Sequence, residues 1–306
     1  MMQSLFRASV SAKKPVPSDF KGIFASVFTS FQSDENQTLQ LSYIEEYAVW
    51  LKERHIKGVL VNSTTGEGPV LGLIERKLNA EAWSRACKKC SLLMMLQIGG
   101  APLPDVLDLA RHANDLHIHA VVCIGELFYV PTKMEQLVGY CKIVAEKCAN
   151  HFFLYYHLPE LTKVKFNPEE FFSSAEMVIP TFAGLVCTQT ELMTAIKCLT
   201  EDRIILMGDS KMLASGMLMG FDAAIMTVAN MEPILMKEIY DAMLRKDLKT
   251  AKTKQHYLNQ LIRNHVTKGK SSWISDMKKW FNERMRSSDG CGIYVGTPRK
   301  FGVYEL

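Results

Sequence analysis

Residues 120–157 read AVVCIGELFYVPTKMEQLVGYCKIVAEKCANHFFLYYH, and this stretch decides the fold class. At its two ends stand short runs with apolar side chains on both faces, 120–125 and 152–157. Between them Leu137, Tyr140 and Val144 recur at the spacing of one face of a helix. Strands that are apolar on both faces and are joined by a helix predict a parallel sheet that helices cover.

The same alternation of apolar runs and helical segments extends over most of the chain. Eight runs are predicted strands, and each is followed by a segment with helical spacing. Eight such units are the number that closes a barrel, so we predict an α/β protein with a (β/α)8 TIM barrel. The predicted strands are 23–28, 58–62, 92–99, 120–125, 152–157, 183–188, 204–208 and 223–228.

The part of the chain after Met231 carries no strand signal. It contains three helical segments, 233–244, 249–264 and 272–285, which predict a helical extension packed on the barrel. The predicted organisation is therefore a disordered tail over residues 1–19, the barrel over 20–230 and the C-terminal helical extension over 231–306.

Composition and charge exclude several classes of function. Of the 306 residues, 48% are hydrophobic and 22% charged, as in ordinary globular proteins. The net charge is only +4 and the basic residues are scattered, so we expect no nucleic-acid partner. No apolar run approaches the roughly 18 residues that a membrane span needs, so we expect no membrane partner either.

The cysteines and the first residues bear on localisation. Eight cysteines without a preceding signal peptide indicate reduced thiols in a cytoplasmic protein. Residues 1–14 contain Arg7, Lys13 and Lys14 and no acid, which weakly resembles a mitochondrial presequence. Cys87 and Cys90 have the spacing of metal ligands but no second pair at a suitable distance, so we predict no metal and no cofactor.

Reactive groups in such a barrel project from the carboxyl ends of the strands. The second strand ends in the sequence VNSTTGEG, residues 61–68, where small hydroxyl residues and glycines lead into a helix. Exposed backbone N–H groups at that point can receive a carboxylate, and Thr64 and Thr65 are the candidate binding residues. The alternative is an ordinary Ser/Thr helix cap with no ligand.

Several motifs occur in one order along the chain: 64–67 (TTGE), 155–159 (YYHLP), 161–162 (LT), 180–182 (PTF), 184–185 (GL) and 298–299 (PR). With these motifs on the predicted barrel, the chain resembles the N-acetylneuraminate lyase and dihydrodipicolinate synthase family. This resemblance implies a homotetramer without a cofactor, with a pyruvate-binding site that cleaves or forms a carbon–carbon bond beside a 2-oxo acid, as class I aldolases do.

One residue that this chemistry requires is missing. In the family a lysine amine condenses with the ketone of the 2-oxo acid, and the imine then accepts the electrons of the breaking bond. The resemblance places that lysine at Val186, because Gly184-Leu185 precedes the position and Thr188 follows it. Valine has no lone pair, so we predict that the Schiff-base cleavage is lost.

The resemblance also assigns roles to other positions. Tyr156 takes that of the proton donor or acceptor, and Tyr129 that of a residue which contacts the neighbouring subunit's site. Tyr156 as a buried core tyrosine and Thr188 as a strand hydroxyl bonded to backbone are the alternatives. The further positions for a sugar-acid ligand are Thr188, Gly208, Ser210, Lys211 and Thr227, where Ser210 and Lys211 replace two family carboxylates and Met226 replaces a glycine.

Four interpretations follow for the function. The first is a divergent N-acetylneuraminate lyase-like protein that keeps a partial pocket for a 2-oxo acid or sugar acid. The second is an active aldolase in which Lys211 supplies a relocated amine. The third is a non-catalytic ligand-binding or regulatory subunit. The fourth is another acid–base reaction using Tyr156 with His157 or Cys187, although strand alternation turns both of the latter away from the barrel interior.

Overall fold

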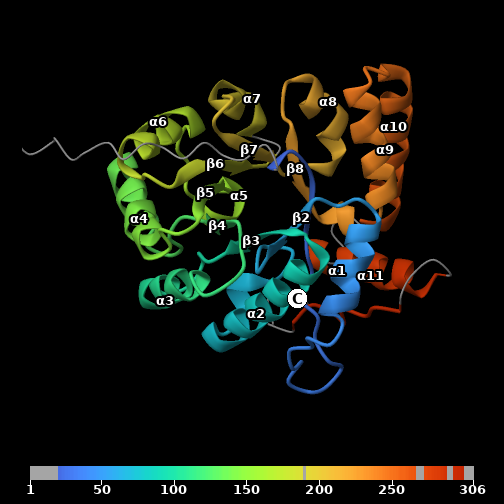
Figure 1. Cartoon of the computed structure of the whole chain (residues 1–306), viewed down its shortest axis with the longest axis horizontal. Coiled ribbons are helices and arrows are strands. Elements are labelled where there is room, and N and C mark those ends of the chain that lie inside the picture. The colour runs from blue at the N-terminus through green and yellow to red at the C-terminus, as the bar shows by residue number, and fades with distance from the viewer. Residues whose placement is uncertain (1–19, 189–190, 267–271, 288–291, 300–306) are drawn as a thin grey trace, which may run out of the picture.

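Eight parallel strands close into a barrel in which each strand pairs with the next and β8 pairs with β1 (Figure 1). The computed structural model describes residues 20–188, 191–266, 272–287 and 292–299. The predicted tail, residues 1–19, lies outside them. The strands are β1 Gly22–Ser26, β2 Gly58–Val61, β3 Leu93–Gln97, β4 Ala120–Cys123, β5 Phe152–His157, β6 Phe182–Cys187, β7 Ile204–Met207 and β8 Ala223–Met226.

The predicted (β/α)8 barrel is confirmed, and every predicted strand is present. The differences lie at strand ends: β1 ends at Ser26 rather than at residue 28, and β3 ends at Gln97 rather than at residue 99. The apolar pattern continues past these points because the loops at the barrel mouth are also buried, as Val27 and Ile98 show.

Helices follow the strands and form an outer ring around the barrel (Figure 1). Most of these helices present one buried face to the strands, such as Val106, Leu109 and Ala113 in α3. The helices between the strands are α1 Ile44–Glu53, α2 Leu73–Cys90, α3 Leu103–Ala113, α4 Met134–Lys147, α5 Pro159–Thr162, α6 Pro168–Val178, α7 Leu192–Ala195 and α8 Leu213–Leu218.

The three helices expected after the barrel are present as α9 Pro233–Leu244, α10 Leu248–His265 and α11 Trp273–Arg286. Helices α9 and α10 pack side by side at one edge of the ring (Figure 1). On α11, Met277, Trp280 and Phe281 are buried. Among the described residues, no helix is long and apolar enough to cross a membrane.

Successive side chains along each strand point alternately into the barrel and toward the helices, and this divides the core into two parts. One cluster fills the barrel interior and contains Phe24, Leu154, Val186 and Leu206. The other lies between the strands and the helices. Because side chains alternate along a strand, the last inward position of each strand places a residue at the mouth of the barrel.

Gly184 allows β6 and β7 to approach closely. Its φ is +145°, and a Cβ at this position would stand 1.8 Å from the carbonyl oxygen of Ile204. A side chain would therefore force the two strands apart as well as strain the backbone.

We expect Gly184→Ala to lower the free energy of unfolding by about 2–4 kcal/mol, from strand displacement and the positive φ together. Urea-induced unfolding measures this change. Gly139→Ala in α4 is the matched control, because nothing lies within 4 Å of its added Cβ. We expect that variant to be as stable as the parent or more stable; equal effects of the two changes would contradict the argument.

Candidate active site at the barrel mouth

A cavity of about 350 Å³ opens at the carboxyl ends of the strands. Residues that follow β2, β4 and β5 line it, among them Thr64, Ile124 and Leu158. Gln97, the last residue of β3, and Trp273, the first residue of α11, complete the wall. The predicted carboxylate receptor and this cavity therefore meet at Thr64.

The loop after β2, residues 62–68, contains the predicted carboxylate-binding residues and is called the receptor loop. Asn62 and Glu67 both adopt left-handed backbone conformations, with φ of +59° and +54°. Among the described residues, the N–H groups of Thr64, Thr65 and Gly66 donate to no backbone carbonyl. Successive N–H groups that are free in a tight turn form a concave site for a carboxylate.

Hydrogen bonds from other strands hold this loop in place. Ser26 Oγ and Ser63 Oγ are 2.5 Å apart, and Thr29 Oγ1 donates to the carbonyl of Gly66 over 2.6 Å. Thr65 Oγ1 and Thr227 Oγ1 are 2.7 Å apart. The hydroxyl of Thr65 is therefore engaged with Thr227, whereas Thr64 lines the cavity.

Tyr156 and Val186 face the barrel interior on neighbouring strands. They are direct partners in the β5–β6 register; Val186 belongs to the interior cluster, and Tyr156 is partly buried and packs against it. Burial raises the pKa of Tyr156 to about 12, so its hydroxyl stays protonated and can donate a proton or a hydrogen bond. Val186 is fully buried, and its side chain contributes only methyl groups to this position.

The predicted sugar-acid positions lie after β6, β7 and β8. Thr188 Oγ1 is buried without a hydrogen-bond partner among the described residues. Gly208 lies beside it, since a Cβ there would be 3.5 Å from Thr188 Cγ2. Asp209 accepts a hydrogen bond from the N–H of Lys211 over 2.9 Å, and the side chain of Lys211 is exposed to solvent.

His157 and Cys187 point away from the barrel interior, as strand alternation predicts. Cys187 belongs to the outer cluster, and the ring of His157 packs near Tyr155. Burial lowers the pKa of His157 to about 4, so its 3.6 Å contact with Glu191 is not an ion pair at neutral pH. Burial also raises the pKa of Cys187 far above its usual range.

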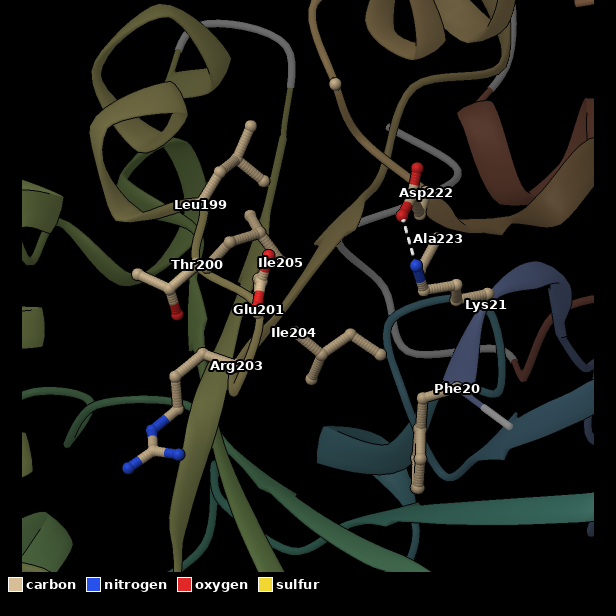
Figure 2. A pocket seen from close by; sticks show the side chains of 11 residues that line it. Phe20, Lys21, Leu199, Thr200, Glu201, Arg203, Ile204, Ile205, Asp222 and Ala223 are labelled. Carbon is tan, nitrogen blue, oxygen red and sulfur yellow. Dashed lines mark ion pairs between the residues drawn. The ribbon is translucent and has the colours of Figure 1, made fainter. Parts of the chain in front are cut away.

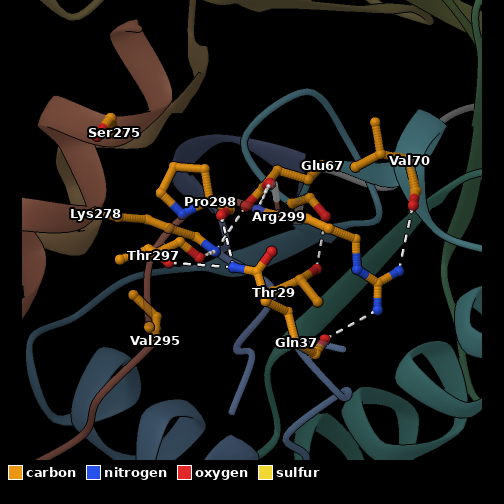
Figure 3. Close-up of polar contacts among 12 residues, drawn as sticks. Thr29, Gln37, Glu67, Val70, Ser275, Lys278, Val295, Thr297, Pro298 and Arg299 are labelled. Atoms are coloured by element: carbon orange, nitrogen blue, oxygen red, sulfur yellow. Dashed lines mark hydrogen bonds and ion pairs between the residues drawn. The ribbon is translucent and has the colours of Figure 1, made fainter. Parts of the chain in front are cut away.

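Sequence reasoning missed a buried ion pair behind the receptor loop (Figure 3). Lys278 Nζ lies 2.6 Å from Glu67 Oε1, and both side chains are almost completely buried. The N–H of Arg299 donates to Glu67 Oε2 over 2.9 Å, and its guanidinium pairs with Glu75. Burial lowers the pKa of Lys278 to about 8 despite Glu67. The C-terminal segment therefore braces the loop that carries Thr64.

Gln97 is the second site residue that sequence reasoning missed. It occupies the last inward position of β3, following Leu93 and Met95, and its side chain is 1% exposed. Its Oε1 has no hydrogen-bond partner among the described residues. A signal was present in the sequence, because a glutamine interrupts an otherwise apolar run.

A second cavity, of about 320 Å³, lies at the opposite end of the barrel (Figure 2). Its walls come from residues that precede or begin β1, β7 and β8, including Phe20, Arg203 and Asp222. Lys21 pairs with Asp222 over 2.7 Å. Barrel enzymes carry their chemistry at the carboxyl ends of the strands, so this cavity is not the candidate active site.

The loop after β4 presents two exposed aromatic rings. Phe128 and Tyr129 are 89% and 82% exposed and contact each other edge to face, with centroids 4.9 Å apart. Phe128 also adopts a positive φ of +67°. A bulky residue rarely tolerates this backbone conformation, so the loop holds the pair outward at some expense in strain.

Comparison with known proteins agrees with this geometry. Residues 19–281 match the model of the dihydrodipicolinate synthetase family. The chain belongs to this family. The N-acetylneuraminate lyase of Homo sapiens is 30% identical over 253 residues, which cover 81% of this chain and 78% of the relative.

Solved structures of family members share the barrel. The N-acetylneuraminate lyase of Proteus mirabilis is 26% identical and superposes with a TM-score of 0.84 over 94% of this chain and 93% of the other. The sialic acid aldolase of Ruminococcus gnavus, solved as a catalytic lysine mutant, is 19% identical with a TM-score of 0.83, covering 94% and 91%. The latter likeness concerns the fold alone.

The contribution of the buried ion pair between Glu67 and Lys278 to the stability of the protein can be tested. We expect Lys278→Met to lower the free energy of unfolding by about 3–5 kcal/mol, because it leaves the carboxylate of Glu67 buried without its charge partner. Adding Glu67→Gln removes that charge and should recover a large part of the loss. Denaturant unfolding of the two single variants and the double variant measures the coupling; strictly additive effects would contradict it.

Proposed function

We propose that this chain is a divergent N-acetylneuraminate lyase-like protein that binds a small 2-oxo acid or sugar acid at the barrel mouth and has lost the Schiff-base aldol cleavage. The observation that carries the proposal is Val186, fully buried beside Tyr156 at the position which the family resemblance gives to the imine-forming lysine. An aliphatic side chain can neither attack a ketone nor accept electrons as an iminium does.

The remaining groups support binding better than catalysis. The free N–H groups at residues 64–66 suit a carboxylate, and the protonated hydroxyl of Tyr156 suits a carbonyl or hydroxyl oxygen. Enzymes lower reaction barriers by about 8 kcal/mol or more, and these groups offer no covalent route through an imine toward that reduction. We therefore infer a pocket without the lyase reaction of the family.

Lys211 is less suited to the role of a relocated amine. Its side chain is exposed at the start of the short helix Ser210–Met212, and desolvation is what makes a lysine nucleophilic at neutral pH. Among the described residues that line the cavity there is no lysine. The relocated-amine hypothesis thus requires Lys211 to turn inward when the ligand binds.

The exposed aromatic pair favours a second candidate function, that of a subunit in a larger assembly. Phe128 and Tyr129 offer a surface for a neighbouring family barrel, either a second copy in a homotetramer or an active relative. In the latter case the chain acts as a non-catalytic, regulatory subunit. We place this role in the cytoplasm, where the free cysteines stay reduced.

We expect no covalent adduct when the purified protein is incubated with pyruvate and sodium borohydride, because the pocket offers no amine to the ketone. Intact-mass spectrometry measures the result, and an active N-acetylneuraminate lyase treated in parallel is the control. A stoichiometric adduct would overturn the proposal, and peptide mapping would then show whether Lys211 carries it.

We expect Val186→Lys to restore trapping of pyruvate by borohydride, because the new amine points into the barrel beside Tyr156. Val186→Met is the matched control, since it adds similar length without an amine. Thermal unfolding verifies that both variants fold. A folded Val186→Lys protein that traps no pyruvate would contradict a preserved pocket and would indicate that Met226 or Lys211 has altered it.

A further inference from the structure

The cavity at the barrel mouth has apolar walls and extends away from the predicted sugar-acid positions. Its apolar lining includes Ile124, Leu127, Leu158, Leu161, Trp273 and Ile274. Ser210 and Lys211, which replace the family's carboxylates after β7, are not part of the lining. A ligand that enters beside Thr64 therefore meets hydrocarbon on the side of β3 to β5.

The cavity presents little free charge to a ligand. Glu67 lines it, but its two carboxylate oxygens face Lys278 Nζ and the N–H of Arg299. Thr64 lines one wall, and its backbone N–H donates to no backbone carbonyl of the described residues, so it is available to a carboxylate. The arrangement suits an acid whose charged end lies at this loop and whose other end is apolar.

One of the polar side chains in the cavity wall, Gln97, has a buried atom that requires a partner. Gln97 Oε1 is buried at the last inward position of β3, lacks a hydrogen-bond partner among the described residues, and belongs to the cavity wall. A buried amide oxygen without a donor is unfavourable, so a ligand that supplies one N–H or O–H is preferred over an otherwise equal ligand that does not.

We propose that the ligand of this cavity is an aromatic 2-oxo acid whose ring carries a single N–H or O–H donor for Gln97. This inference rests on the proposed function, because the carboxylate of the 2-oxo acid lies beside Thr64, which lines this cavity. It adds that the chain recognises an aromatic side chain in place of the polyol of a sugar acid.

Titration calorimetry on the full chain tests the proposal with pyruvate, phenylpyruvate, indole-3-pyruvate and N-acetylneuraminate as probes. We expect phenylpyruvate to bind at least about tenfold more tightly than pyruvate, because apolar area is buried, and indole-3-pyruvate more tightly again because its N–H reaches Gln97. N-acetylneuraminate should bind more weakly than either aromatic acid.

Variants at two residues of the cavity wall test whether aromatic acids bind in this cavity or on exposed apolar surface in general. Trp273→Gln and Leu161→Gln change partly exposed residues of the cavity wall. We expect each variant to lower the affinity for aromatic acids at least about fivefold and to leave the affinity for pyruvate unchanged. Tyr257→Gln on α10 is the matched control, because Tyr257 is 53% exposed and lies outside the cavity lining. Gln97→Leu should abolish the preference for indole-3-pyruvate over phenylpyruvate.

The results distinguish a failure of the proposed function from a failure of the proposed aromatic specificity. If none of the four acids binds, the proposed function itself fails. If pyruvate or N-acetylneuraminate binds as tightly as the aromatic acids, the pocket stands and the aromatic specificity is overturned. If the wall variants and Tyr257→Gln weaken binding equally, the aromatic acids do not occupy this cavity, and the inference is likewise overturned.

Discussion

The alternation of side chains along eight strands in a closed ring is the constraint on which this molecule depends. This alternation points Tyr156 and Val186 into the barrel interior. It points the next residues along the strands, His157 and Cys187, toward the surrounding helices. Closure leaves no strand edge that could shift register and exchange the two sets. The chemistry at the mouth is therefore decided by the identity of a few inward strand ends, and one of them is a valine.

The mouth is assembled from parts that lie far apart in the sequence. The receptor loop between Asn62 and Gly68 follows the second strand, yet its charge partner Lys278 belongs to the last helix. A Cβ on Gly68 would lie 1.9 Å from the carbonyl oxygen of Asn62, which shows how tightly the loop closes. The contacts that hold this loop do not involve Val186, so they do not depend on which residue occupies that position.

Most of the fold could be predicted from the sequence, whereas the site could be predicted only in part. Strand and helix periodicities act locally, so the eight strands and the three final helices were recognisable. The positions of Tyr156 and Val186 followed from motif and parity. Lys278 was not recognisable, because its pairing with Glu67 joins residues more than 200 positions apart and no local pattern encodes such a contact. Gln97 was not recognisable as a strand end, because the apolar run continues to Ile98, whereas β3 ends at Gln97.

The contacts of Lys278 and Arg299 with Glu67 have a consequence for biosynthesis. During translation the strands that form the barrel emerge long before Lys278 and Arg299, whose side chain and backbone N–H satisfy the carboxylate of Glu67. A nascent chain that is still attached to the ribosome can thus form the barrel while the carboxylate of Glu67 remains hydrated. The mouth of the barrel is therefore completed last, and premature release would yield a protein with a nearly complete barrel whose loop after β2 lacks these contacts.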